Sequence, residues 1–379
     1  VFEGSPYPPH LVIRIAVPKE NAAREARVAL VPESVAKLVK SGATVSVEHD
    51  AGLAAGFTDA NYVTAGATIA VDFASVVTDA TLVCKVQPPI ASEVAALPAA
   101  ATLICYLAQS GSAETIAALA SRTVNALALE KVPRITRAQS MDVLSSQATV
   151  SGYKAVLIGA GLLPKMLPML TTAAGTLAPA KVFVIGAGVA GLQAIATAKR
   201  LGGLVSGFDV RPAAQEQIAS LGGTPLKIDL GHSAEGSGGY AKEQAEEDAI
   251  KTQQAIAKHV EQVDLIITTA AIPGRRAPLL ITEAAIKGMK PGSVIVDLAC
   301  ETGGNAAFTK PGETVVAHDV SIVGPLNLPS QASFHASQML SRNVLTLVTH
   351  LMKDNALVLD ASDEITGAML VALDGQVRA

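Results

Sequence analysis

The chain has 379 residues, a length that favours two domains over one. Half of the residues are hydrophobic and 3% are aromatic, so we expect cores of Ala, Val, Leu and Ile, as in parallel sheets covered by alanine-rich helices. A formal net charge of −4 and the lack of a basic stripe argue against nucleic acid as a partner. The three cysteines and seven histidines are scattered, which predicts a reducing compartment and no metal site.

Two segments are set apart before the fold is considered. Residues 1–10 carry three prolines and no periodicity, so we leave them out of the predicted fold. The apolar stretch 182–198 is interrupted by glycines at a spacing that suits a nucleotide-binding turn. No membrane span is therefore predicted.

From residue 12, short apolar strands alternate with helical segments. The expected elements of the first third are strands at 12–17, 43–48, 82–86 and 102–106 and helices at 32–40 and 113–120. A second series begins at residue 181, with strands expected at 182–185, 204–208, 265–268, 294–297 and 315–317 and a helix at 191–201. Such alternation predicts parallel sheets with right-handed crossovers.

The rest of the chain suggests how the two series are joined. Residues 230–240 are rich in Gly and Ser and predict an exposed, mobile loop, and residues 246–248 predict an exposed helix face. Five apolar residues near the C-terminus recur at helical spacing, Leu340, Val344, Leu347, Val348 and Leu351. We therefore predict an α/β protein with two doubly wound, Rossmann-like parallel-sheet domains separated by a cleft. The first domain would be discontinuous, 11–144 plus 335–379, and the second would be 145–334.

The strongest local signal is the glycine turn in KVFVIGAGVAG, residues 181–191. It follows an apolar strand and opens a helix. Gly186 permits the tight turn, Gly188 lets the backbone approach a pyrophosphate, and Gly191 allows close packing of helix on strand. The helix N-terminus then offers N–H groups and a partial positive charge to the phosphates. Plain packing is the alternative interpretation of a lone GxGxxG.

An acidic residue supports the dinucleotide interpretation. Asp209 ends the next expected strand, 18 residues after Gly191. Its carboxylate would accept hydrogen bonds from the adenosine ribose hydroxyls and repel a 2′-phosphate, which favours NAD(H) over NADP(H). Arg211 could instead hold that phosphate. We give Asp209 more weight because it sits at the strand end.

A second motif, PRITRAQSMDVLS at 133–145, precedes the glycine turn. It resembles the arginine–glutamine–aspartate loop of the NAD(H)-binding component of proton-translocating nicotinamide nucleotide transhydrogenase. The resemblance covers nearly the whole chain after the first dozen residues. The other matching segments are PKE at 18–20, RVAL at 27–30, KVQP at 85–88, GAGVAGLQAIATAKRLG at 186–202, DVR at 209–211, GGYAKE at 238–243, TTAAIPG at 268–274 and KPGSVI at 290–295.

The resemblance implies a set of site residues. The residues around the nicotinamide end would be Arg134, Gln139, Asp142 and Ser145. Further cofactor contacts would come from Ile135, Thr136, Ser140, Met141, Val189, Val210, Arg211 and Ala271, the last on the adenosine side. Gly239 and Tyr240 would lie on a loop that closes over the cofactor, with Tyr240 as a lid residue rather than an acid or base. Such residues orient a ring, although Arg134 and Asp142 could also be a solvated ion pair.

The resemblance also implies partners. The family passes hydride directly from NADH to NADP⁺ held by a separate NADP(H)-binding domain, and a membrane proton-channel domain couples the exchange to proton movement. The chain would be a homodimeric, peripheral subunit on the cytoplasmic side of a bacterial inner membrane, or in the mitochondrial matrix. The enzyme would be an oxidoreductase and translocase that needs its partner for activity.

Alanine dehydrogenase, which resembles the same two domains, is the alternative enzyme. Oxidising an amino acid needs a proton acceptor and a cation for the substrate carboxylate. That family has a second lysine where this chain has Gln87, and a histidine where it has Leu107-Ala-Gln109. Hydride transfer between two cofactors needs no protein acid or base, so the sequence favours transhydrogenase. A module that senses NADH without chemistry is a third possibility.

Overall fold

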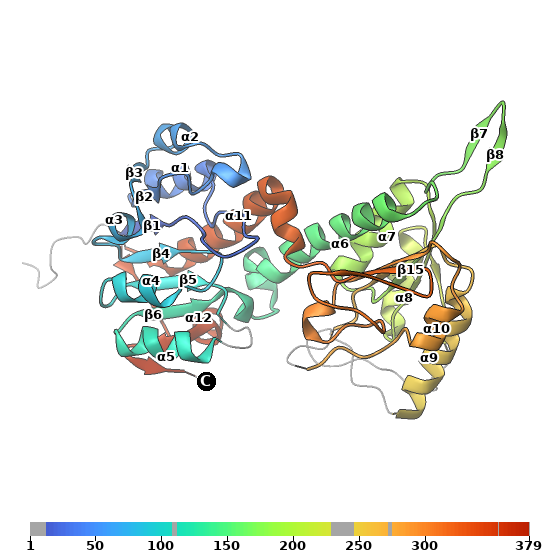
Figure 1. Ribbon diagram of the computed structural model, residues 1–379. Helices are drawn as coiled ribbons and strands as arrows, with labels where there is room; N and C mark the ends of the chain where they lie inside the picture. The colour runs from blue at the N-terminus through green and yellow to red at the C-terminus, as the bar shows by residue number, and fades with distance from the viewer. Residues whose placement is uncertain (1–12, 108–111, 229–245, 272–274, 355, 379) are drawn as a thin grey trace, which may run out of the picture. The chain divides into compact units, whose positions relative to one another are not determined.

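The computed structural model describes residues 13–107, 112–228, 246–271, 275–354 and 356–378 (Figure 1). The chain divides into two compact units. The first unit combines residues 1–147 with 329–379, and the second unit is 148–328. The boundaries expected from the sequence, at 144/145 and 334/335, lie within a few residues of these limits. Among the described helices, none is both long and apolar enough to cross a membrane.

The first unit is built on an eight-stranded sheet in the order β19-β18-β6-β5-β4-β1-β2-β3. The strands are β1 (Arg14–Val17), β2 (Thr44–Glu48), β3 (Thr68–Ala70), β4 (Leu82–Cys84), β5 (Thr102–Cys105), β6 (Asn125–Ala128), β18 (Leu370–Leu373) and β19 (Gln376–Val377). The helices are α1 (Pro32–Lys40), α2 (Asp59–Thr64), α3 (Phe73–Val77), α4 (Ala91–Ala96), α5 (Ala113–Ser121), α11 (Ser333–Leu351) and α12 (Glu364–Met369). The strands from β1 to β6 pair in parallel, as predicted.

Both faces of this sheet are covered by apolar side chains. Ile15 and Val17 of β1 belong to one core cluster, and Ala16 between them belongs to the cluster on the other face. This alternation follows from the two-residue repeat of a strand, and it explains the continuous apolar runs in the sequence. The predicted C-terminal helix is present as α11, which buries Leu340 and Val344 in the same cluster as Ile15.

The C-terminal end of the first sheet departs from the all-parallel prediction. Strand β18 pairs antiparallel with β6, and β19 turns back to pair antiparallel with β18. The turn between them is Asp374-Gly375, and both residues have a positive φ, 49° and 79°. Two left-handed residues form the tight turn that matches the twist of a hairpin, so this part of the chain is antiparallel.

The second unit has a seven-stranded sheet in the order β11-β10-β9-β12-β13-β15-β14. The strands are β9 (Lys181–Ile185), β10 (Leu204–Phe208), β11 (Thr224–Pro225), β12 (Leu265–Thr268), β13 (Val294–Asp297), β14 (Thr314–Ala317) and β15 (Val320–Val323), and the helices are α6 (Val143–Leu162), which begins in the first unit, α7 (Val189–Arg200), α8 (Pro212–Ser220), α9 (Glu246–Val260) and α10 (Glu283–Lys287). A separate hairpin, β7 (Leu170–Thr172) and β8 (Gly175–Leu177), projects from this unit (Figure 1).

Two expectations for the second unit were wrong. The strand expected at 315–317 is an antiparallel edge strand, because His318 and Asp319 both take a positive φ and form a two-residue hairpin turn. The expected exposed face at 246–248 is only partly exposed, since Asp248 is 6% exposed. Asp248 lies at four-residue spacing from the buried residues Thr252, Ile256 and Val260, so it shares the inward face of α9.

Candidate dinucleotide-binding site

The second sheet changes direction between β9 and β12. From β9 the chain continues to β10 and β11 on one side, whereas β12, β13 and β15 lie on the other side. In open α/β sheets, ligands bind outside the carboxyl ends of the strands at this switch point. The glycine turn follows β9 and the segment 269–271 follows β12, so the structure places both at the position where a ligand is expected.

The three glycines of the turn have different surroundings. Gly186 has a φ of 91°, which favours glycine, and a Cβ on Gly191 would overlap the carbonyl oxygen of Gly186. A Cβ on Gly188 would meet nothing within 4 Å. Gly188 is also the N-cap of α7 and provides no side-chain cap. The open space and the uncapped helix start fit the pyrophosphate of a dinucleotide.

Asp209 lies directly beside the glycine turn. Its Oδ2 accepts a hydrogen bond from the main-chain N–H of Ala187 at 2.7 Å, and its side chain is buried. The guanidinium of Arg211 donates to both carboxylate oxygens at 2.9 Å. Burial alone would raise the pKa of Asp209, but the hydrogen bonds from Arg211 and Ala187 outweigh it and lower the pKa. The carboxylate is therefore charged, and it holds the arginine that we weighed as a rival phosphate ligand.

Thr269 is a residue of this site that the sequence analysis missed. Its N–H donates to the carbonyl oxygen of Ile185 at 2.8 Å, and its Oγ1 donates to that of Gly186 at 3.1 Å. A Cβ on Gly186 would lie 2.6 Å from this hydroxyl oxygen. Thr269 thus occupies the space that the missing side chain of Gly186 leaves. The available signal was a hydroxyl residue directly after the strand on the other side of the switch point.

The remaining expected contacts of the second unit are less enclosed. Val189 begins α7 and is 40% exposed. Val210 is half-buried and packs on the core cluster that contains Phe208. Ala271 is exposed at the end of the segment that follows β12. Gly239 and Tyr240 lie outside the described residues.

The arginine–glutamine–aspartate loop lies in the first unit. Residues Thr136–Met141 form a short 3-10 helix (η3), and α6 starts two residues later. The side chains of Arg134, Thr136, Gln139 and Ser140 are exposed, Ile135 is half-buried, and Met141 is buried in the core. Asp142 accepts hydrogen bonds from Ser145, at 2.9 Å from the main-chain N–H and 2.6 Å from Oγ. The structure therefore brings the expected pair Asp142 and Ser145 together at the start of α6.

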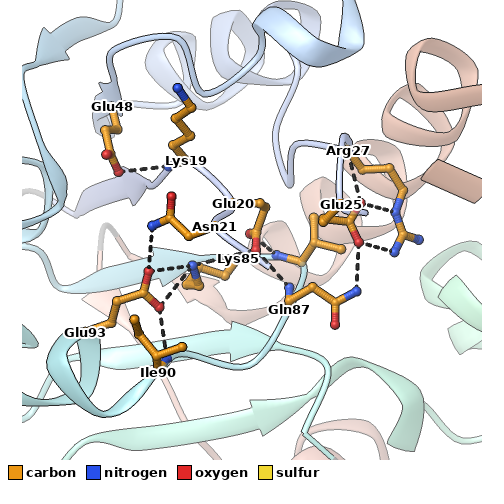
Figure 2. Close-up of polar contacts among 11 residues, drawn as sticks. Lys19, Glu20, Asn21, Glu25, Arg27, Glu48, Lys85, Gln87, Ile90 and Glu93 are labelled. Carbon is orange, nitrogen blue, oxygen red and sulfur yellow. Dashed lines mark hydrogen bonds and ion pairs between the residues drawn. The ribbon is translucent and has the colours of Figure 1, made fainter. Parts of the chain in front are cut away.

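A buried ionic cluster occupies the switch point of the first sheet, between β1 and β4 (Figure 2). Lys85 follows β4 and is 2% exposed. Its Nζ lies 3.6 Å from Glu20 and 3.4 Å from Glu93, each measured to a carboxylate oxygen. Glu20 also accepts from the main-chain N–H groups of Val86 and Gln87, at 2.6 and 3.2 Å. Burial raises the pKa of Glu20, although Lys85 acts to lower it.

The second half of this cluster is centred on Glu25. Its carboxylate forms an ion pair with Arg27 at 2.7 Å and accepts from the side-chain amide of Gln87, also at 2.7 Å (Figure 2). Arg27 donates onward to Gln147 at 2.9 Å. Burial would raise the pKa of Glu25, but the hydrogen bonds and charge of Arg27 and the amide of Gln87 lower it to about 2. Both buried cations of this edge, Lys85 and Arg27, are thus paired with carboxylates of the chain itself.

One group among the described residues has the ligand types of a metal site. His49, Asp50 and Asp59 lie together on the surface of the first unit. Nδ1 of His49 is 2.6 Å from Asp59, and Nε2 is 3.4 Å from Asp50. Both ring nitrogens therefore already contact carboxylates, and the group forms surface ion pairs.

Two Rossmann-type sheets, one with a glycine turn and a charged aspartate at its switch point, define a two-domain nucleotide-binding protein of the dehydrogenase type. The family models for the N-terminal and C-terminal domains of alanine dehydrogenase/PNT match residues 16–151 and 155–379. Both domains of this family are therefore represented, in the expected order.

Individual relatives refine this assignment. An NAD(P) transhydrogenase alpha subunit of Rhodospirillum rubrum is 47% identical over 374 residues, which cover 96% of this chain and 97% of the relative. A crystal structure of transhydrogenase from Sinorhizobium meliloti has a TM-score of 0.88 at 42% identity, covering 96% of this chain and 100% of that one. An alanine dehydrogenase of Halomonas elongata is 32% identical, with coverages of 96% and 94%. The chain belongs to the alanine dehydrogenase/PNT family and, within it, to the NAD(P) transhydrogenase alpha subunits.

Proposed function

We propose that the chain is the NAD(H)-binding component of a proton-translocating NAD(P)⁺ transhydrogenase. The observation that carries this proposal is the charged carboxylate of Asp209, 2.7 Å from the N–H of Ala187 in the glycine turn. A charged acceptor at this position suits the ribose hydroxyls of NAD(H) and repels the 2′-phosphate of NADP(H). Because Arg211 is bonded to Asp209, the ion pair also offers less positive charge to such a phosphate.

The reaction is a hydride exchange between two nicotinamides. The hydride leaves C4 of NADH and joins C4 of NADP⁺ on a partner domain, giving NAD⁺ and NADPH. No proton is exchanged at the reacting carbons, so the protein has to hold the two rings close and correctly oriented. The exposed side chains of Arg134 and Gln139, and the Asp142–Ser145 pair, supply polar groups for that task.

The first unit supports this proposal over amino-acid oxidation. A dehydrogenase needs a cation for the substrate carboxylate and a proton acceptor. Lys85 is enclosed between Glu20 and Glu93, and Arg27 is bonded to Glu25. Gln87, which carries no charge, contacts the same Glu25. These groups satisfy one another, and a buried ion pair is costly to break.

The partners follow from the same proposal. An NADP(H)-binding domain would accept the hydride, and a membrane proton-channel domain would couple the exchange to proton movement. The chain would be peripheral, on the cytoplasmic side of a bacterial inner membrane or in the matrix of a mitochondrion. A homodimer is supported by the projecting β7–β8 hairpin, where Met169 and Leu177 are 63% and 53% exposed, because exposed apolar side chains favour burial in an interface.

The test combines the purified chain with an NADP(H)-binding partner and nicotinamide analogues of distinct absorbance. We expect hydride exchange in the mixture and none with the chain alone. Tight NADH binding without exchange would favour an NADH sensor. Conversion of alanine and NAD⁺ to pyruvate and NADH by the chain alone would favour the dehydrogenase. Light scattering of the eluting peak in size-exclusion chromatography measures whether the chain is a dimer.

A further inference from the structure

The side chain of Asn305 holds both main-chain groups of Ala270. Its Oδ1 accepts from the N–H of Ala270 at 3.0 Å, and its Nδ2 donates to the carbonyl oxygen of Ala270 at 2.8 Å. Nδ2 also donates to the carbonyl oxygen of Pro278 at 2.9 Å. Asn305 is fully buried. One amide thus fixes the main chain directly after β12, on the wall of the switch point opposite the glycine turn.

Asn305 is in turn held by Asp297, the last residue of β13. Oδ2 of Asp297 accepts from the main-chain N–H groups of Asn305 and Ala306 at 2.7 and 3.1 Å and from Thr309 Oγ1 at 2.8 Å. Oδ1 accepts from Thr268 Oγ1, at 2.8 Å, and from the N–H of Ala299. Asp297 is fully buried. It therefore ties the ends of β12 and β13 together and presents the amide of Asn305 to Ala270.

The clamp reaches the nucleotide turn through the neighbouring residue. Thr269 precedes Ala270 and donates to the carbonyl oxygens of Ile185 and Gly186, which fixes the turn from below. A shift of the main chain at Ala270 would move this hydroxyl and the exposed Ala271 with it. A displacement of about 1 Å at a binding site is enough to weaken binding or catalysis strongly.

We propose that Asn305 is a positioning residue for dinucleotide binding: its amide sets the main chain at Ala270 and, through Thr269, the glycine turn. The inference rests on the proposed NAD(H) function of this turn. Asn305 touches the protein and acts through Ala270, so it has no part in the chemical step. The role requires an acceptor and a donor on one side chain, which distinguishes an amide from a carboxylate.

The experiment compares Asn305→Ala and Asn305→Asp in the full chain by NADH fluorescence titration at pH 8.0 and pH 6.0. Asn305→Ala loses both contacts, and we expect about tenfold weaker binding at both pH values. Asn305→Asp keeps the acceptor but points a second carboxylate oxygen at the carbonyls of Ala270 and Pro278. Protonation lets that oxygen donate again. Burial and the neighbouring carboxylate of Asp297 raise the pKa of the introduced carboxyl, so we expect affinity to recover at pH 6.0.

Asn125 provides the matched control. It is a buried asparagine of the first unit, and its Oδ1 accepts from the N–H of Asp374 at 2.9 Å. Asn125→Ala and Asn125→Asp should lose stability but keep wild-type NADH affinity at both pH values. If Asn305→Ala does not fold, Asn305→Ser, which leaves a polar group in the cavity, replaces it with the same expected loss.

The outcomes separate the inference from the function on which it rests. Wild-type affinity in the Asn305 variants, an equal loss in the Asn125 variants, or no recovery of Asn305→Asp at pH 6.0 would overturn the positioning role. Failure of the unmodified chain to bind NADH would instead remove the proposed function. Thermal melting in parallel verifies that each protein is folded at the temperature of the titration.

Discussion

Asn343 donates a hydrogen bond from Nδ2 to the main-chain carbonyl of Ser140 at 2.7 Å, across 203 positions of sequence. The donor lies on α11, in the C-terminal segment of the first unit, and the acceptor lies in the arginine–glutamine–aspartate loop. Arg137 of the same loop pairs with Asp363 at 3.0 Å. The returning C-terminal segment therefore holds this loop from two sides, which gives a physical reason for a discontinuous unit.

We expect Asn343→Leu to change the free energy of unfolding by less than about 1 kcal/mol. The lost hydrogen bond to Ser140 costs about 1 kcal/mol. Among the described residues, however, Oδ1 of Asn343 is a buried acceptor without a partner, and leucine removes it at similar size. Urea denaturation measures the difference. A loss above about 3 kcal/mol would show that Asn343 does more than hold Ser140.

The proposed positioning role of the loop predicts a separation of rate from affinity. Gln139→Ala and Asp142→Asn should slow hydride exchange by about tenfold to a hundredfold and change the NADH dissociation constant by less than about threefold, because orientation matters in the transition state more than in binding. Stopped-flow exchange with the NADP(H)-binding partner and a fluorescence titration measure the two quantities. Normal exchange rates in both variants would rule out the positioning role.

Two glycine substitutions in the turn should have opposite effects. Gly191→Ala places a methyl group on the carbonyl oxygen of Gly186 and should destabilise the protein by at least about 1–3 kcal/mol. Gly188 has a φ of −76° and open space around its Cβ position, so Gly188→Ala should leave stability unchanged or slightly higher. The same methyl group should hinder a pyrophosphate and weaken NADH binding about tenfold or more. Thermal melts and titrations of the pair decide this.

Much of the fold could be predicted because the buried strands are apolar on both faces. The strands 204–208, 265–268 and 294–297 have the predicted limits. The long helix α6 was missed, since its apolar residues are spread around the helix and interrupted by Gly152, Gly159 and Gly161. Gly152 is required where α6 meets the main chain of Ala190, a contact that periodicity does not reveal.

The candidate site shows the same limit. The glycine turn and Asp209 could be predicted because the motif is local in sequence. Thr269 and Asn305 act across 83 and 35 positions, so their roles depend on which strands are neighbours. The antiparallel return of the C-terminus was predictable to some extent: Asp374-Gly375 between apolar residues is a common hairpin signal, and it was passed over.

Asp209→Ala should weaken NADH binding about tenfold to a hundredfold, since hydrogen bonds to a charged group contribute about 1.5–3 kcal/mol. The variant also releases Arg211 and removes the repulsion of a 2′-phosphate, so the affinity for NADPH relative to NADH should rise. Asp209→Asn, which keeps an acceptor for Ala187, serves as the milder control. Unchanged NADH affinity by fluorescence titration would remove the ribose assignment.

The last prediction concerns Glu25 and pH. Its pKa in the folded protein is about 2, against 4.5 as the ordinary value, and its side chain is fully enclosed. A lowered pKa adds stability that is complete above pH 4.5 and is lost as the pH falls towards 2. The shift corresponds to roughly 3 kcal/mol at 1.36 kcal/mol per pKa unit.

Glu25→Gln should therefore be less stable than the natural chain at pH 6, and the difference should shrink as the pH falls from 4.5 towards 2. Glu33→Gln is the matched control, because Glu33 pairs with Lys37 at 2.8 Å on the surface, where an ion pair contributes less than about 0.5 kcal/mol. Urea denaturation from pH 6 to pH 3 measures both variants. A constant difference for Glu25→Gln across this range would mean that its charge does not stabilise the buried cluster with Arg27 and Gln87.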